Sequence, residues 1–128
     1  MNETGSRGKA VQIAEAIMEE ILAQTLRPGS PVPSVRETAM QMGVTPNTAA
    51  NAHARLRDLG IIKPERGTGS LVQDDAMGIA RNFIMQTFVE LELPLLARRM
   101  KQLNLSEKNL IDLLKQTDLK DNVIGESK

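Results

Sequence analysis

One stretch in the first half of the chain, residues 28–69, limits the possible fold most strongly. Its sequence is PGSPVPSVRETAMQMGVTPNTAANAHARLRDLGIIKPERGTG. Two short helical patterns are joined there by a glycine at position 43, and two β-prone segments then flank a glycine-rich tip. Helix, tight turn, helix and β-hairpin, in this order, are typical of a winged helix-turn-helix. We therefore predict a mainly α-helical fold with a small β-wing.

The first helical pattern of this stretch carries a strong start signal. Ser34 precedes it and Glu37 follows three residues later, which is the spacing of a capping box. Gly43 fits the left-handed position that ends a helix, because a residue without Cβ adopts that conformation without steric cost. The inner face of this helix is predicted to consist of Val35, Ala39 and Met42.

The second helical pattern presents short polar groups near its N-terminal end. Thr45 is predicted to cap it, and Pro46 to occupy the first position, where a missing N–H costs nothing. A helix that enters the major groove needs small polar groups at this end, so that its backbone can approach the bases. Taken alone, such a face is more often ordinary solvated surface. The exposed face is predicted to carry Asn47, Thr48, Asn51 and Arg55, and the buried stripe Ala49, Ala52, Leu56 and Leu59.

The β-prone segments over residues 60–73 are predicted to form the wing. Lys63 and Arg66 would bring cations to the DNA backbone or minor groove, while Gly67 and Gly69 permit a tight turn. A plain hairpin that covers the hydrophobic core is equally compatible with this segment when it is considered alone.

Charge and composition allow a nucleic-acid partner without demanding one. The 128 residues carry a formal net charge of +0, yet six cations stand against three acids between positions 27 and 73. DNA binding would then depend on a small set of cations rather than on a global field. Aromatic residues make up only 2% of the chain, so the core must be aliphatic, which suits packed helices.

Several classes of function are disfavoured. One histidine, no cysteine and no phosphate-binding glycine loop give little for catalysis, so we expect neither an enzyme nor a cofactor or metal site. The absence of a long apolar run or signal peptide predicts a cytoplasmic protein without a membrane partner. A winged helix that docks another protein, without specific DNA binding, stays open as the alternative function.

Four segments are predicted along the chain. An amphipathic helix is predicted over residues 9–24. Pro28 would prevent the helix from continuing, because proline cannot extend the hydrogen-bond ladder. The predicted segments are a flexible N-terminus (1–8), a winged helix-turn-helix DNA-binding domain (9–75), a helical dimerisation region (76–116) and a polar tail (117–128).

The C-terminal region has more apolar surface than one helix can hide against a small domain. Pro94 should kink or break a helical run over residues 76–103 near Glu90, and Ser106 should cap a last helix. We expect a homodimer through these helices, which would place two recognition helices in half-sites about 34–36 Å apart. Packing back onto the same chain is the alternative, and any small-molecule effector is unknown.

These residues resemble the GntR family of bacterial transcriptional regulators. The resemblance covers residues 10–72, through PG at 28–29, PSVRE at 33–37, VTPNTA at 44–49 and RGTGSLV at 66–72. The Pro46-Asn47-Thr48 sequence and the short helical tail are similar to the YtrA-like branch. The resemblance implies a dimeric repressor of a palindromic operator, and it suggests a transporter operon as the target.

Carried over residue by residue, the resemblance implies which side chains contact DNA. Many members have arginine where Pro46 and Asn51 stand, so this chain lacks two cations often used at DNA. His53 stands where the branch commonly has tyrosine, and we interpret it as a core or rim residue rather than a sensor. The predicted DNA-binding residues are Ser34, Arg36, Thr45, Asn47, Thr48, Asn51, Arg66, Gly67 and Thr68.

Overall fold

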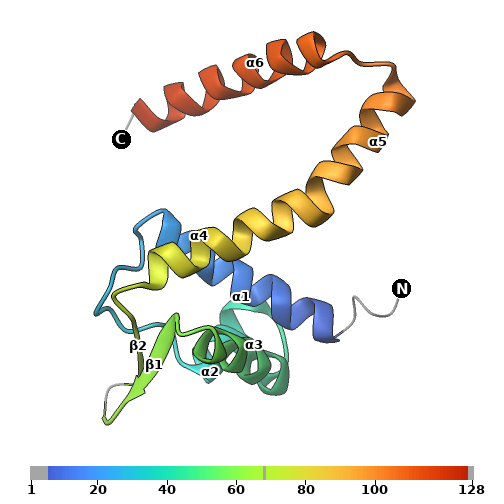
Figure 1. Ribbon diagram of the computed structural model, residues 1–128. Helices are drawn as coiled ribbons and strands as arrows, with labels where there is room; N and C mark the ends of the chain where they lie inside the picture. The colour runs from blue at the N-terminus through green and yellow to red at the C-terminus, as the bar shows by residue number, and fades with distance from the viewer. Residues whose placement is uncertain (1–5, 68, 127–128) are drawn as a thin grey trace. The chain divides into compact units, whose positions relative to one another are not determined.

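The structure is a computed structural model that describes the backbone of residues 6–67 and 69–126, and the side chains of residues 8–67 and 69–118. It contains two compact units, which meet in sequence between Gln86 and Thr87 and are treated separately below. Figure 1 shows α1 (Ser6–Leu22), α2 (Val35–Met42), α3 (Pro46–Asp58), β1 (Ile62–Glu65), β2 (Gly69–Val72), α4 (Ala76–Thr87), η2 (Phe88–Glu92), α5 (Leu93–Leu103) and α6 (Glu107–Glu126).

The first unit is organised around α1, whose apolar stripe lies at the centre of the core. In Figure 1, α1 lies between α4 and the pair formed by α2 and α3. Full burial of one large aliphatic side chain contributes about 1.5–3 kcal/mol to stability. The largest fully buried apolar side chains are Met18, Ile21, Leu56, Ile61, Ile62 and Val72.

The bounds of α1 differ from the prediction at both ends. The helix begins at Ser6, so three residues of the predicted flexible N-terminus are helical. It ends at Leu22 rather than at the predicted Gln24, because Gln24 adopts a left-handed conformation with φ 65°. The N–H of Gln24 donates to the carbonyl of Ile21 at 3.0 Å, which closes the last turn before the proline is reached.

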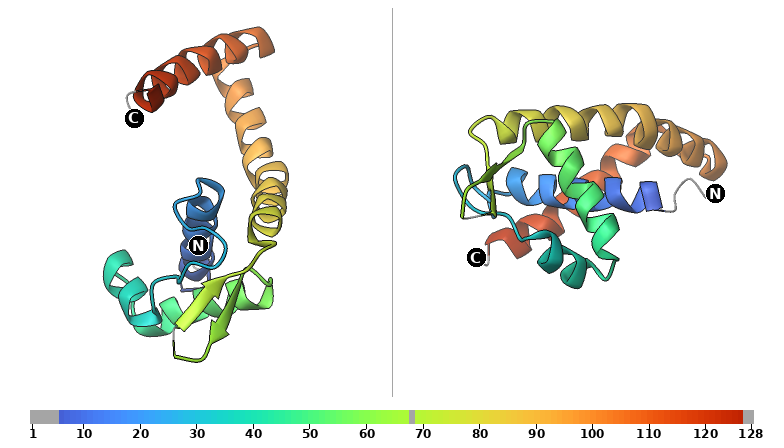
Figure 2. Two further views of the ribbon diagram at one scale, coloured as in Figure 1. Left: turned by 90° about the vertical axis from the view of Figure 1, so that its left-hand side faces the viewer. Right: turned by 90° about the horizontal axis from the view of Figure 1, so that it is seen from below.

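The predicted wing is present as an antiparallel pair of strands, visible in both views of Figure 2. Strand β2 is also bonded on its other side, since the N–H of Gly29 donates to the carbonyl of Val72 at 2.8 Å and Pro31 bridges to Leu71. That addition was not predicted. Among the described residues, β1 pairs with no strand other than β2, and Pro64 is tolerated at its outer edge.

Helix α4 belongs to the first unit, although the sequence placed residues 76–116 in one dimerisation region. Ala76 and Ala80 are fully buried in the core, and Phe83 packs against it. Small side chains let a helix approach a core closely. The prediction from sequence considered only the large apolar residues of this region and therefore did not include the contact. The second compact unit therefore starts at Thr87, later than the predicted boundary at residue 76.

The second unit consists of η2, α5 and α6. The predicted irregularity before Pro94 is confirmed, and it takes the form of a π-helical turn, η2. Ser106 caps α6 as predicted, because its Oγ accepts the N–H of Asn109 at 3.0 Å. Helix α6 continues to Glu126, so the predicted polar tail is helical over its described residues. Within the described part of the chain, no helix is long and apolar enough to cross a membrane.

Candidate nucleic-acid interface

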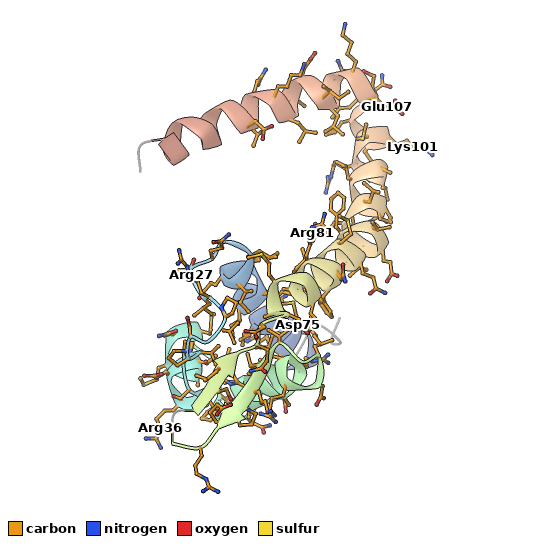
Figure 3. All side chains as sticks on the ribbon, turned by 60° about the vertical axis from the view of Figure 1, so that its left-hand side comes forward. Arg27, Arg36, Asp75, Arg81, Lys101 and Glu107 are labelled. Atoms are coloured by element: carbon orange, nitrogen blue, oxygen red, sulfur yellow. The ribbon has the colours of Figure 1, made fainter. Side chains whose placement is uncertain are left out.

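The start of α2 is fixed by the predicted capping box. Ser34 Oγ accepts the N–H of Glu37 at 3.0 Å, and Glu37 Oε1 accepts the N–H of Ser34 at 2.9 Å. These two bonds satisfy donors that a helix start otherwise leaves unpaired. They also fix the first turn of α2, which carries Arg36. Figure 3 shows the Arg36 side chain pointing away from the body of the first unit.

The turn between α2 and α3 is formed by Gly43, as predicted. Gly43 has φ 67° and ψ 37°, and its N–H donates to the carbonyl of Ala39. The predicted inner face of α2 is wrong at one position, because Met42 is 39% exposed. Thr38 takes its place as a buried residue, since it lies on the same side of the helix as Ala39 and faces α3.

Helix α3 starts with the predicted Thr45 cap and Pro46. Thr45 Oγ1 accepts the N–H of Thr48 at 3.2 Å, and the two threonine hydroxyls are 3.0 Å apart. Thr48 was predicted on the outer face, but only 8% of it is exposed. Its hydroxyl is thus used within the cap. Asn47 and Asn51 are exposed, as a surface that contacts DNA requires.

One side of α3 faces the core, as predicted. Ala49, Ala52 and Leu56 are fully buried, which confirms most of the predicted stripe, but Leu59 is 36% exposed. Leu59 is the C-terminal cap, where the helix leaves the core. Arg55 is half-buried and lines a cavity of about 170 Å³ together with residues of α1 and α4.

The tip of the wing places one predicted cation in solvent. Arg66 and Gly67 form the turn between β1 and β2, and both are exposed. Gly67 has φ 82°, a left-handed conformation that strongly favours glycine, although no heavy atom would contact an added Cβ there. Thr68, the third predicted wing residue, lies outside the described residues.

Behind this surface, a buried polar pair connects α2 to α3. His53 is 3% exposed, and its Nε2 is 3.0 Å from Thr38 Oγ1. Burial lowers the pKa of His53 below its ordinary value of 6.5, and the charge of Arg57 lowers it further. The interpretation of His53 as a core residue is confirmed. Thr38 was missed because only apolar residues were counted on α2, although its position three residues after Val35 placed it on the inner face.

Most of the exposed predicted residues carry side chains that donate hydrogen bonds. They supply an arginine and a hydroxyl at the start of α2, two asparagines on α3 and an arginine at the wing tip. Such donors suit phosphate oxygens and base edges. Among the described residues, no cluster of three or more histidines, cysteines or carboxylates could hold a metal ion.

Related sequences give this surface a context. Residues 9–72 match the family described as bacterial regulatory proteins, gntR family. The uncharacterized HTH-type transcriptional regulator YhcF of Bacillus subtilis is 30% identical over 105 residues, which cover 82% of this chain and 85% of that protein. The HTH-type transcriptional repressor YtrA of the same organism is 33% identical over 92 residues, covering 72% of this chain and 65% of that protein.

Solved structures agree with the sequence comparison. A GntR family transcriptional regulator from Listeria monocytogenes has a TM-score of 0.65 and 29% identity, over 84% of this chain and 92% of that one. The predicted winged helix-turn-helix is confirmed, and these relatives are regulators rather than enzymes. The chain belongs to the GntR family of transcriptional regulators and carries its DNA-binding helix-turn-helix domain.

Proposed function

We propose that this chain is a dimeric repressor that binds a palindromic operator through the start of α2, the N-terminal half of α3 and the wing tip. One observation carries the proposal most directly. Asn47 and Asn51 are exposed on α3, whose opposite side is buried in the core and whose first turn is held by the Thr45 cap. A rigidly held helix with short polar side chains fits the geometry of a major-groove contact.

The asparagines are the residues that distinguish bases. An asparagine amide can donate and accept at once, and it pairs well with the adenine edge in the major groove. Thr48 contributes differently in this proposal, because its hydroxyl is 3.0 Å from that of Thr45 and it is nearly buried. It supports the cap and does not contact a base.

The residues on α2 and the wing position the protein on the DNA backbone. The Ser34 oxygen accepts one hydrogen bond from Glu37, so its own proton remains available for a phosphate oxygen. Arg36 and Arg66 are exposed cations that suit phosphates or a minor groove. Because Pro46 and Asn51 carry no charge, we expect few phosphates to be neutralised and a shallow dependence of affinity on salt.

The second unit supports pairing of two chains. Neither η2 nor α5 has a buried residue, and large apolar side chains are exposed along the unit. A second copy related by two-fold symmetry would cover such a surface and would match a palindromic operator. The exposed apolar residues are Phe88, Val89, Leu91, Leu93, Leu95, Leu103, Ile111, Leu113 and Leu114.

Repression and a transporter target are the finer parts of the proposal. The similar protein YtrA is named a transcriptional repressor, which supports repression. The transporter operon rests on the resemblance to the YtrA-like branch alone. Transcript levels in a strain that lacks the gene test both parts. Transcripts of a transporter operon should rise on deletion, and a fall would identify an activator.

The experiment that tests DNA recognition starts with selection of bound duplexes from a random pool by the purified protein. The selected site should have two-fold symmetry with half-sites about one helical turn apart. Arg36→Ala, Asn47→Ala and Arg66→Ala should each weaken binding to it by about 5- to 150-fold, the equivalent of about 1–3 kcal/mol.

Arg81→Ala is the matched control for the two arginine variants. It removes the same charge from an exposed position of α4 in the same unit, and its affinity for the selected duplex should stay within about 2-fold of wild type. Unchanged binding by all three interface variants would defeat the proposed surface. An equal loss in Arg81→Ala would show that net charge, rather than placement, determines the affinity.

A further inference from the structure

The hydrogen bond between His53 and Thr38 is a buried link between α2 and α3. The two residues lie 15 positions apart, and their side chains meet at 3.0 Å between Nε2 and Oγ1. Helix α2 has only eight residues, and its buried ones are Thr38 and Ala39. Because one of these two buried residues is polar, the orientation of α2 depends on a directional bond as well as on apolar packing.

The link continues beyond Thr38 to the residue before the α2 cap. The Thr38 hydroxyl donates to the carbonyl of Pro33 at 3.4 Å. A hydroxyl has a single proton, so this donation requires the Nε2–H of His53 to donate to Thr38. The chain of bonds therefore runs from the middle of α3 to Pro33, next to Ser34 and close in sequence to Arg36.

The surroundings of His53 favour a neutral ring, whose Nε2–H tautomer can donate to Thr38. Burial and the positive charge of Arg57, one turn along α3, both lower the pKa of His53. On α2, Glu37 is adjacent in sequence to Thr38, but its carboxylate is bound to the N–H of Ser34. A neutral imidazole with one N–H is thus the form present at neutral pH.

We propose that His53 is a positioning residue for operator recognition: through Thr38 it fixes the angle between α2 and α3, so that Arg36 and Asn47 contact one DNA site together. The physical reason is that a hydrogen bond is directional. Apolar packing tolerates sliding, whereas a hydrogen bond weakens steeply as it misaligns. The inference rests on the DNA-contacting surface proposed above and adds the buried pair that holds its two helices in register.

The test compares Thr38→Val with Thr38→Ser in the full-length protein. Valine keeps the shape of threonine and loses the hydroxyl, while serine keeps the hydroxyl. Affinities for the selected operator duplex and for a scrambled duplex are measured at a temperature where thermal unfolding shows each variant to be folded. Thr38→Val should lose about 3- to 10-fold in operator affinity, the effect of one hydrogen bond, and should change little on scrambled DNA.

The conservative variant and the second duplex separate positioning from a loss of stability. Thr38→Ser should bind the operator within about 2-fold of wild type. If Thr38→Val melts earlier but binds the operator as wild type does, the positioning role is overturned. A loss on both duplexes by the same factor overturns it as well, because general phosphate contacts do not need a precise helix angle.

Variants at His53 repeat the comparison from the α3 side in case Thr38→Val does not fold. His53→Gln keeps a hydrogen-bond donor of similar reach, and His53→Leu keeps none. The affinity of the glutamine variant for the operator should therefore be at least about 3-fold higher than that of the leucine variant. Equal affinities overturn the proposal. If Arg36→Ala and Asn47→Ala also bind as wild type does, the proposed surface fails together with it; if they weaken binding, only the positioning role fails.

Discussion

The two units of this protein bury their apolar residues to very different extents. In the first unit, residues from α1, α3, α4 and the wing form one core of fully buried side chains. In the second unit, α5 has no buried residue, and Leu103, for example, is 59% exposed. Both units have a normal share of apolar residues in sequence. The first unit therefore has a core within itself, whereas most large apolar side chains of the second are exposed.

This difference supports the proposal that the first unit contacts DNA and the second joins two chains. A helix that contacts base edges must be held rigidly, and α3 has that support from α1. A surface that joins identical chains must instead leave apolar residues exposed in the single chain.

A matched pair of leucine truncations should separate the units most clearly. Leu56 is fully buried, so Leu56→Ala should lower the free energy of unfolding by about 2–5 kcal/mol. Leu103→Ala removes the same atoms from an exposed site and should cost less than about 1 kcal/mol in the single chain. Urea unfolding at low protein concentration measures both. Equal losses would mean that the second unit has a core of its own.

The second prediction concerns self-association. Leu95→Gln combined with Leu114→Gln should weaken the dimer by about 10- to 100-fold or more, because each leucine would lose its apolar partner surface. Sedimentation equilibrium measures the change. Met40→Gln is the control, since Met40 is an exposed apolar residue of α2 in the other unit. An unaltered dimer in the double variant, or an equal loss in the control, would contradict the proposed role of the second unit.

The smallest effect expected is a dependence of stability on pH that His53 alone produces. Its pKa in the folded protein is below its ordinary value of 6.5, so the unfolded chain binds more protons. The stabilisation is complete above pH 6.5 and declines as the pH falls through the folded pKa, by at most about 1.4 kcal/mol per pH unit for one proton.

His53→Phe provides the control for this titration, because His53 is the only histidine of the chain. Urea unfolding between pH 7.5 and 5 should show the decline in the wild-type protein, with any affinity tag removed, and a weaker one in the variant. Identical pH profiles would show that His53 titrates normally. Increased stability at low pH would reverse the sign of the argument.

Sequence patterns predicted the local parts of this fold well. The caps at Ser34 and Thr45 and the turn at Gly43 each depend on bonds that span three to five residues, so a short stretch of sequence contains the whole signal. The wing is similar, because only residues 66–68 separate its two strands in the sequence. Most of the candidate DNA surface follows from these local elements.

Contacts between distant parts of the chain were harder to predict. The bond from Thr38 to His53 depends on how two helices pack, and neither residue marks it alone. Thr48 was predicted to face outward because it is polar, yet the docking of α3 turns it toward the core. The assignment of α4 to the first unit depends on Ala76 and Ala80, whose small size carries no strong hydrophobic signal. In each case, packing rather than residue type decides the position.

The most direct test of the DNA-contacting surface is binding to the selected operator duplex and to a scrambled duplex, each at a low and a high salt concentration. Arg36→Ala and Arg81→Ala are measured alongside the wild-type protein. We expect tighter binding to the operator at both salt concentrations, weaker binding at high salt, and a loss in Arg36→Ala that Arg81→Ala does not share. Equal affinity for both duplexes at both salt concentrations, unaffected by Arg36→Ala, would contradict recognition of DNA through this surface.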